Sequence, residues 1–216
     1  MSSNSSQSDE KCLKCIFVGN AAVGKTSMIV SYTTNGYPHN YIPTAFDNFS
    51  VVVLVDKKPI RLQLHDTAGQ SSFDTLRPLC YTDADVFVIV YSVVNIQSFD
   101  DVIDHWYPEV TRKNNGVKII LVGTQIDQRW QMRSTDTVST QRGKHVAQQI
   151  GAEFYECSAL TQHNLKEMFD SAILAGLESA QKRAATAANN RSRFYNKSTK
   201  IKERVAKFIT RTRNLI

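Results

Sequence analysis

Hydrophobic positions along this chain follow two different periods. Short runs rich in β-branched and aromatic residues, bounded by polar residues, predict strands. Apolar residues spaced three and four apart predict amphipathic helices. Because strands alternate with helices, the pattern predicts an α/β fold with a mostly parallel six-stranded sheet and helices on both faces. The strand runs cover residues 13–18, 51–55, 60–64, 86–94, 117–122 and 153–157, and the helical patterns cover residues 25–34, 98–111, 141–150 and 165–177.

One pair of predicted strands departs from the parallel arrangement. The second and third runs are separated by residues 56–59, Asp-Lys-Lys-Pro, which are too few for a crossover helix. We therefore expect an antiparallel hairpin at the edge of the sheet. Ligands of such sheets bind beyond the carboxyl ends of the strands, so the loops after residues 18, 64, 122 and 157 are the places to look for a site.

The loop after the first predicted strand has the composition of a phosphate cradle. Residues 19–26, Gly-Asn-Ala-Ala-Val-Gly-Lys-Thr, fit the pattern G-x-x-x-x-G-K-[ST] and precede a helical pattern. Glycines permit the tight turn, the lysine reaches the β/γ-phosphate oxygens, and the threonine hydroxyl can ligate Mg²⁺. The helix N-terminus adds a positive end. The sequence thus predicts nucleoside triphosphate binding through Gly19, Ala21, Ala22, Val23, Gly24, Lys25, Thr26 and Ser27.

Two further loops contain residues that could act on the phosphates and residues that could select the base. Asp66, Gly69 and Gln70 follow the third strand, where the carboxylate can hold Mg²⁺ through water, the Gly69 N–H can meet a γ-phosphate and Gln70 can orient the attacking water. A carboxylate such as that of Asp127 offers two acceptor oxygens to the paired N–H donors of guanine, and adenine would leave it unpaired. The predicted guanine contacts come from Thr124, Gln125 and Asp127, with a backbone N–H from Ser158, Ala159 or Leu160.

Composition and charge limit the number of domains, the origin of the net charge and the cellular compartment that we expect. The 216 residues suffice for one globular domain and a tail. The net charge of +6 arises in residues 181–216, which carry eleven Lys or Arg against one acid. Four irregularly spaced cysteines are too few for a disulfide framework, which favours a reducing cytosol. Cys12 and Cys15 have the spacing of half a zinc site but lack a second ligand pair, so a metal is not expected there.

Five ordered motifs together resemble the Ras-superfamily small GTPases over roughly residues 12–178, and within them the Rho/Rac branch. The motifs are residues 19–26, 41–48, 66–70, 124–127 and 156–160. The resemblance implies a P-loop GTPase domain that binds GTP or GDP with Mg²⁺ and hydrolyses GTP. It implies that Thr44, with Thr26 and Asp66, belongs to the metal site and that Thr44, Lys25 and Gln70 act in hydrolysis. It also implies that Tyr37 lies across the guanine, although a tyrosine half-buried in a loop is the alternative.

The resemblance also implies partners. Phe46, Asp47 and Phe49 fall in the segment with which Rac-type proteins engage effectors, and Asp47 resembles members that bind Cdc/Rac-interactive-binding (CRIB) peptides by strand addition. An inward-packed phenylalanine is the alternative for one of Phe46 and Phe49. Exchange factors and GTPase-activating proteins are implied as regulators, with a monomer as the default state.

Three features depart from the family pattern. Ala21 stands where relatives usually carry glycine, close to Gln70 and to an incoming arginine finger, which predicts impaired hydrolysis unless the loop shifts to tolerate the methyl group. Ser71 replaces an acid that helps exchange factors remove nucleotide. The stretch between Asp127 and Glu156 is short, so most of the inserted helix of Rho proteins is expected to be absent.

The tail departs as well, because this chain has no cysteine after Cys157 and therefore no prenylation box. Apolar residues at helical spacing, surrounded by Lys and Arg, suit an anionic membrane surface, and a solvated tail is the alternative. Nucleic-acid binding is not expected, because no base-reading surface accompanies the charge. The apolar positions of this segment are Ile201, Val205, Phe208, Thr212 and Leu215.

The sequence therefore predicts three regions: a disordered segment at 1–10, a GTPase domain at 11–179 and a basic tail at 180–216. The expected function is a Rho-like GTP/GDP switch with outputs in actin organisation, polarity or membrane traffic. It would act in the cytoplasm and on the cytosolic face of the plasma membrane or endomembranes. The alternative is a GTPase-impaired, largely GTP-loaded module that binds effectors and is controlled by expression and location. An ATP-using kinase is excluded by the fit of residues 124–127 to guanine.

Overall fold

The structure is a computed structural model that describes residues 11–39, 44–112, 114 and 116–186. The chain divides into two compact units, residues 1–179 and residues 180–216. The predicted N-terminal segment at 1–10 and most of the predicted tail lie outside the described residues. Among the described residues, no helix combines the length and the apolar character needed to cross a bilayer.

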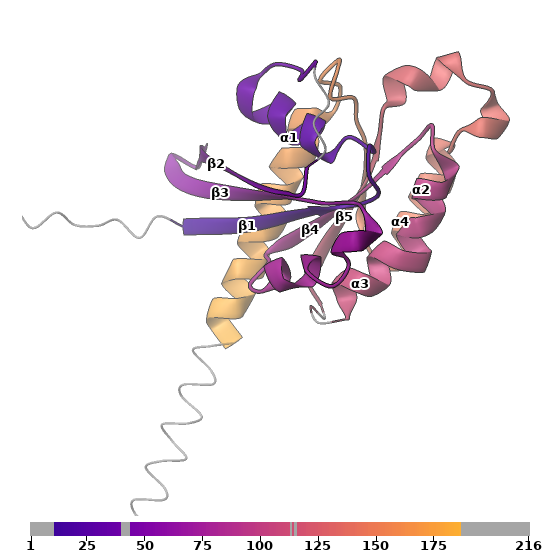
Figure 1. The fold of residues 1–216 in the computed structure, drawn as a ribbon. Coiled ribbons are helices and arrows are strands. Elements are labelled where there is room, and N and C mark those ends of the chain that lie inside the picture. The colour runs from indigo at the N-terminus through magenta and orange to yellow at the C-terminus, as the bar shows by residue number, and fades with distance from the viewer. Residues whose placement is uncertain (1–10, 40–43, 113, 115, 187–216) are drawn as a thin grey trace, which may run out of the picture. The chain divides into compact units, whose positions relative to one another are not determined.

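A six-stranded sheet forms the centre of the first unit (Figure 1), in the order β2-β3-β1-β4-β5-β6. Every neighbouring pair is parallel except β2 and β3, which are antiparallel. This is the predicted mostly parallel sheet with one antiparallel strand at its edge. The strands are β1 (Lys11–Val18), β2 (Phe46–Val55), β3 (Lys58–Thr67), β4 (Val86–Ser92), β5 (Lys118–Thr124) and β6 (Glu153–Glu156).

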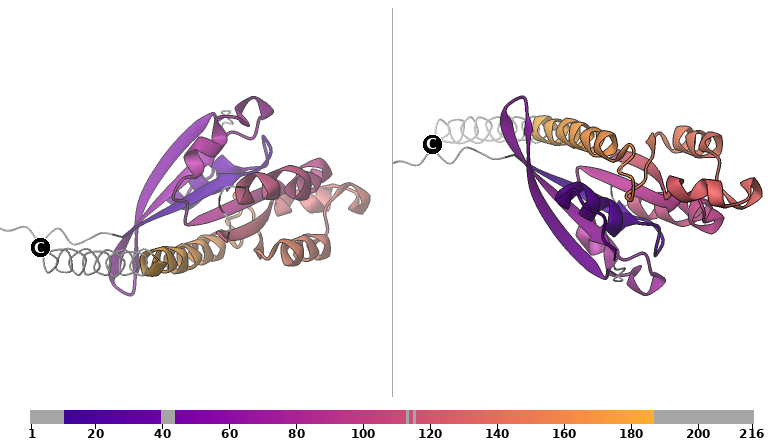
Figure 2. Two further views of the ribbon diagram at one scale, coloured as in Figure 1. Left: turned by 90° about the horizontal axis from the view of Figure 1, so that it is seen from below. Right: turned by 90° about the horizontal axis from the view of Figure 1, so that it is seen from above.

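Helices cover both faces of this sheet (Figures 1 and 2). On one face α1 (Lys25–Thr34) packs beside a helix that spans residues 165–179 of this unit, where Tyr32 stacks on Phe169 at 3.9 Å and Phe169 contacts Phe17 of β1. The other face carries one helical segment between β4 and β5 and another between β5 and β6. These are α2 (Ile96–Asp101), the π-helical turn η3 (Val102–Trp106) and α3 (Tyr107–Thr111), followed by α4 (Thr140–Ile150).

The buried core follows from the apolar runs of the sequence. Strand β4 is buried along its whole length, and β5 is buried at all but its first residue, as expected for central parallel strands covered on both faces. Phe87, Ile89 and Leu121 pack against Phe99 and Trp106 in one cluster. The core therefore holds the carboxyl ends of β1 and β5 in fixed relation, and two of the candidate loops begin at those ends.

Several element boundaries differ from the sequence expectation. Strand β2 begins at Phe46 rather than at residue 51, because its polar first half is held by pairing with β3. The hairpin turn is only two residues long, Asp56 and Lys57, both with positive φ, and the predicted turn residue Pro59 lies within β3. Positive φ at both central positions is the type I′ geometry, whose twist matches the strands. The helix predicted at 98–111 begins at residue 96, because Asn95 caps it, and is interrupted by η3.

Candidate nucleotide-binding site

The loop between β1 and α1 is shaped by two glycines with positive φ. Gly19 has φ 145° and Gly24 has φ 96°. A Cβ atom on Gly19 would lie 2.1 Å from the carbonyl oxygen of Val90, so no larger residue fits this position without moving the backbone of β4. Val23 is buried at the bottom of the loop, whereas Ala21 and Ala22 are exposed at its rim. The buried Val23 thus anchors the loop to the protein interior, while Ala21 and Ala22 face the solvent.

Lys25 begins α1 and holds this loop closed from one side. Its side chain is buried, and Nζ donates hydrogen bonds to the carbonyl oxygens of Gly19 and Asn20, both at 2.8 Å. Burial lowers the pKa of Lys25 to about 8, against an opposing effect of Asp66. An ammonium group in these surroundings gains from a bound anion, because an anion favours the charged form.

Three oxygen-bearing side chains from three segments meet beside Lys25. The Thr26 and Thr44 hydroxyls lie 2.8 Å apart, and the Thr26 hydroxyl donates to Oδ2 of Asp66. The other carboxylate oxygen, Oδ1, is buried and has no hydrogen-bond partner among the residues that the structure describes. Burial raises the pKa of Asp66, while Thr26 and Lys25 oppose that rise. An unpaired buried carboxylate oxygen beside two hydroxyls has the chemistry of a hard-cation site.

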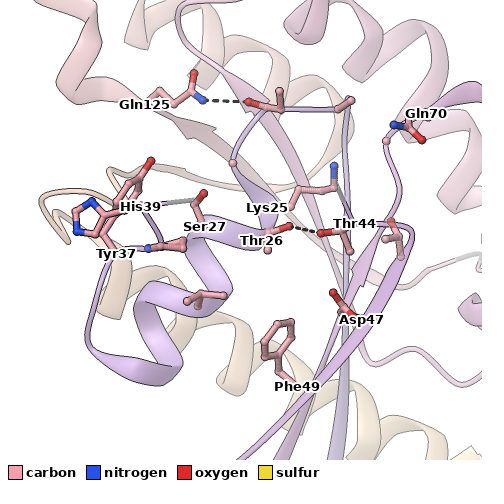
Figure 3. A pocket seen from close by; sticks show the side chains of 17 residues that line it. Lys25, Thr26, Ser27, Tyr37, His39, Thr44, Asp47, Phe49, Gln70 and Gln125 are labelled. Carbon is pink, nitrogen blue, oxygen red and sulfur yellow. Dashed lines mark hydrogen bonds between the residues drawn. The ribbon is translucent and has the colours of Figure 1, made fainter. Parts of the chain in front are cut away.

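Lys25, Thr26 and Thr44 line a cavity of about 420 Å³ (Figure 3), a size typical of small-molecule sites, and Asp66 lies behind Thr26 outside this lining. Gln70 lies at its border and its side chain is exposed, while Tyr37 stands at the side farther from Thr44 together with His39. The Tyr37 and His39 rings meet edge to face at 5.8 Å. Thus Tyr37 is in the cavity wall rather than packed into the core. The lining residues that the sequence singled out also include Ala21, Ala22, Gly24, Lys25, Thr26, Ser27, Thr44 and Gly69.

Gly69 brings the segment after β3 directly against the phosphate loop. A Cβ atom at Gly69 would lie 2.3 Å from the backbone nitrogen of Ala21 and 2.4 Å from the carbonyl oxygen of Gly19. Only a glycine allows this approach, because backbone atoms cannot rotate away as a flexible side chain can. Ala21 therefore lies where the phosphate loop, Gly69 and Gln70 converge.

The residues after β5 connect this loop to the predicted base site. The Thr124 hydroxyl lies within hydrogen-bond distance of the carbonyl oxygens of Val23 and Tyr91, and it can donate its single proton to either or share it between them. The side-chain amide of Gln125 donates to Ala22 O at 3.1 Å, and its oxygen accepts from the hydroxyl of Ser92. Thr124 and Gln125 therefore fasten the loop after β5 to the phosphate loop. The role of Ser92 was missed by the sequence analysis, because a serine at the end of a strand has no distinctive pattern.

Asp127 and the loop after β6 meet at the far side of Gln125. The Ser158 hydroxyl donates to Oδ1 of Asp127 at 2.6 Å, and the Ala159 carbonyl accepts from Ser31 of α1. Leu160 is half exposed. The lining of the cavity includes Gln125 but not Asp127, so the two parts of the predicted site adjoin at Gln125.

An ion pair that the sequence analysis missed holds these two loops together. Arg129 donates to both carboxylate oxygens of Glu156 and to the carbonyl oxygen of Val138. Thr140 donates to the same carboxylate at 2.8 Å. Arg129 follows Asp127 in η4 (Ile126–Gln131), and Glu156 lies two residues before Ser158. No local pattern pairs residues 27 positions apart, so only the fold reveals this contact.

The predicted effector segment presents its side chains to two sides of β2. Phe46 is 39% exposed and its ring lies 5.9 Å from that of His65, whereas Asp47 and Phe49 border the cavity (Figure 3). Phe49 is partly buried at the border of the cavity. Residues 41–43 of the same motif lie outside the described residues.

The departures from the family pattern can be located in part. Ser71 is exposed in η1 (Ser71–Phe73). Between β5 and α4, within a fully described stretch, the chain forms only the short 3₁₀ helices η4 and η5 (Ser134–Asp136). Residues 180–186 of the second unit are helical. The apolar positions from Ile201 to Leu215 lie outside the described residues.

Comparison with known proteins agrees with this site. The model of the Ras family matches residues 14–178. The Rho-related GTP-binding protein RhoV of Homo sapiens and that of Rattus norvegicus are each 50% identical to this chain over 176 residues, which is 77% of this chain and 75% of the relative. The Bos taurus RhoV is 49% identical over 183 residues, 80% of this chain and 78% of the relative. The chain therefore belongs to the Ras family and, within it, to the Rho branch of small GTPases.

Proposed function

We propose that this chain binds GTP and GDP with Mg²⁺ in the cavity beside Lys25 and acts as a Rho-type switch through the segments around Thr44 and Gln70. The family makes the chain a GTPase that converts GTP to GDP and phosphate. The observation that carries the residue assignment is the meeting of Thr26, Thr44 and Asp66 next to the buried Lys25 ammonium.

Small GTPases generally use Mg²⁺, and the donor set here suits it. Two hydroxyls and a carboxylate, one of whose buried oxygens has no partner in the described part of the chain, are hard ligands that favour Mg²⁺ over softer metals. Thr26 and Thr44 would hold the ion directly, with Asp66 acting through water. Bound Mg²⁺ would neutralise charge on the β/γ-phosphate oxygens during transfer.

The protein residues would supply positioning and charge. On nucleotide binding, the Lys25 ammonium would give up its hydrogen bonds to the two loop carbonyls and donate to phosphate oxygens instead. Charged phosphate oxygens form stronger hydrogen bonds with an ammonium group than neutral carbonyls do. Gly69 would present its N–H to the γ-phosphate, and Gln70 would orient the attacking water. Asp127 would accept from the two guanine donors, with Ser158 already fixing one of its oxygens. Thr124, Gln125, Ala159, Leu160 and Tyr37 complete the proposed base site.

Partners follow from the family and from the exposed edge of the sheet. Strand β2 is the outermost strand and Phe46 is exposed on it, which suits addition of an effector strand of the CRIB type. Regulation by exchange factors and GTPase-activating proteins is the corresponding proposal for control. A basic tail acting at an anionic membrane surface is the proposal for location, with outputs in actin organisation, polarity or traffic.

Calorimetry with a matched variant tests the nucleotide proposal. Refolded, nucleotide-stripped protein should release heat with GTP and Mg²⁺ but not with ATP and Mg²⁺. Asp127→Ala should lose most of the preference for GTP, whereas Asp136→Ala, in the neighbouring helix η5, should keep it. Equal GTP and ATP affinity in the unaltered protein would refute the assignment of Asp127.

Ala21 supports a second candidate function, a slow-hydrolysing and largely GTP-loaded effector-binding module. Its backbone touches Gly69, and both residues border the cavity with Gln70, so the methyl group adds bulk where an arginine finger would enter. An arginine finger contributes a factor on the order of 10³–10⁵, so a small displacement is costly. Stimulated single-turnover hydrolysis should be at least about tenfold faster in Ala21→Gly. Equal stimulated rates would remove this candidate.

A further inference from the structure

Arg77 is a buried cation that contacts the backbone on both sides of Gly69. Only 3% of the residue is exposed, and it lies at the start of η2 (Arg77–Tyr81). Its Nε donates to the carbonyl oxygen of Ala68 at 2.8 Å, and Nη2 donates to the carbonyl oxygen of Gln70 at 3.1 Å. One guanidinium group thus fixes the carbonyl of Ala68 and the carbonyl of Gln70. These carbonyls determine the backbone position from which the Gln70 side chain extends.

The guanidinium group is itself held from three directions. It donates to Asp74 and to Glu109, each at 2.7 Å, and lies over the Trp106 ring at 4.5 Å from the ring centre. Tyr81 donates to the second oxygen of Glu109. A planar fork with several charge-assisted bonds and a stacked ring has one preferred position, which a lysine ammonium cannot reproduce.

The same tryptophan reaches the phosphate loop. The indole N–H of Trp106 donates to the side-chain oxygen of Asn20 at 2.6 Å, and the Asn20 amide donates to Asp101 at 2.5 Å. Asn20 is the second residue of the phosphate loop, and Trp106 ends the π-helical turn η3. The contacts therefore run from the phosphate loop through Trp106 and Arg77 to the backbone of Gln70.

A metal site is the competing interpretation of this cluster. Asp74, His105 and Glu109 bring three possible ligand atoms within 4.8 Å of one another. However, Arg77 already donates to both carboxylates, so a cation there would be repelled by the guanidinium charge and would have to displace it. His105 lies 3.4 Å from Glu109 and 3.8 Å from Asp74, at the solvent side of the same group. The cluster is a closed charge network centred on an arginine.

We propose that Arg77 is a positioning residue for hydrolysis, which holds Gln70 through the carbonyls of residues 68 and 70 and is itself aligned by Glu109 and Trp106. This inference rests on the proposed role of Gln70. Among the described residues, the Gln70 side chain has no hydrogen bond of its own, so its backbone is what directs it. The hydrogen bond of Trp106 to Asn20 of the phosphate loop involves no atom of Arg77, so the phosphate loop keeps this support when Arg77 is replaced.

A double-mutant cycle separates positioning from a general structural role. Single-turnover GTP hydrolysis is measured for Arg77→Lys, Gln70→Ala and the double variant, in the native chain and in the Ala21→Gly background. Arg77→Lys should slow hydrolysis about 10- to 100-fold, the cost of misplacing a catalytic group by about 1 Å. In the Gln70→Ala background the same change should alter the rate by less than about twofold, because the two residues act as one unit.

Release of fluorescent GDP provides the readout that a merely structural defect would move. Arg77→Lys should leave the release rate within about twofold of the unaltered protein. Glu109→Gln keeps the shape of the network and removes one charge. It should slow hydrolysis less than Arg77→Lys does, and it too should have little effect in the Gln70→Ala background. If Arg77→Lys does not fold, Glu109→Gln tests the proposal in its place. Equal slowing with and without Gln70, or no slowing in Gln70→Ala itself, would overturn the proposal. Absence of GTP binding in the unaltered protein would instead refute the proposed function.

Discussion

Breaking the Arg129–Glu156 ion pair should both destabilise the fold and loosen the predicted guanine site. Arg129 is 28% exposed and Glu156 is 12% exposed, and Arg129 makes three hydrogen bonds. Removing one partner of a fully buried pair costs about 3–5 kcal/mol, since it leaves an unpaired charge. Because more than a quarter of the arginine side chain remains in solvent, we expect Arg129→Ala to cost about 2–3 kcal/mol.

The matched control is another arginine in an exposed pair. Arg142 and Asp100 are each about half exposed and lie 3.7 Å apart. Exposed pairs contribute about 0–1 kcal/mol, so Arg142→Ala should cost less than about 1 kcal/mol even with the loss of its contact over the Phe99 ring. Both variants are unfolded with urea in saturating GDP and Mg²⁺, at two nucleotide concentrations, so that ligand linkage can be subtracted.

The second readout is nucleotide release. Arg129 holds the segment with Asp127 against the segment with Ser158, so part of the lost energy should appear as faster GDP release. Each 1.4 kcal/mol transferred to the site accelerates release about tenfold. If Arg129→Ala and Arg142→Ala have the same unfolding free energy and the same release rate, the reasoning that this pair joins the two base loops is wrong.

Three further outcomes are expected. Alkylation at pH 8 followed by mass spectrometry should label the exposed Cys12 but neither Cys15 nor Cys157. Burial raises the pKa of both of these thiols, that of Cys157 to about 12. Labelling of Cys157 in the folded protein would contradict this expectation. Gly19→Ala should give little folded protein on expression, since its Cβ would lie 2.1 Å from a backbone oxygen, whereas Gly36→Ala, whose Cβ would make only ordinary van der Waals contacts, should be recovered normally by gel filtration. Removing Mg²⁺ with EDTA should accelerate fluorescent GDP release in the unaltered protein but much less in Asp66→Ala.

The strands and helices could be predicted because each carries its own period. The apolar run of β4 and the amphipathic pattern of α4 identify their elements without tertiary information, and the predicted bounds of α1 are confirmed. The first half of β2 could not be predicted, because Asp47, Asn48 and Ser50 carry no strand pattern and are held by pairing with β3. The two-residue turn was also unpredictable, since neither Asp56 nor Lys57 is a glycine.

The candidate site divides in the same way. Residues 19–26 and Asp127 are recognisable because their chemistry is fixed by short spacings. Trp106 and Glu156 are not, because each gains its role from a partner 27 or more positions away, and Arg77 is aligned by Glu109, which is 32 positions away. The sequence contained one indirect indication: an arginine and a tryptophan are costly to bury alone, so each needs a polar partner in the fold.

The π-helical turn η3 has a consequence for how this protein can vary. A π turn contains one residue more than an α-helix of equal rise, and each residue of an α-helix advances about 100° around the axis. Deleting one residue from 102–106 would restore the regular hydrogen bonding of an α-helix. It would also rotate Asp101 relative to Trp106, so that the two side chains could not contact Asn20 at the same time. A more regular helix would thus cost this protein the contacts between the helical segment and the phosphate loop, and it would also turn the buried Phe99 away from Trp106 in the core.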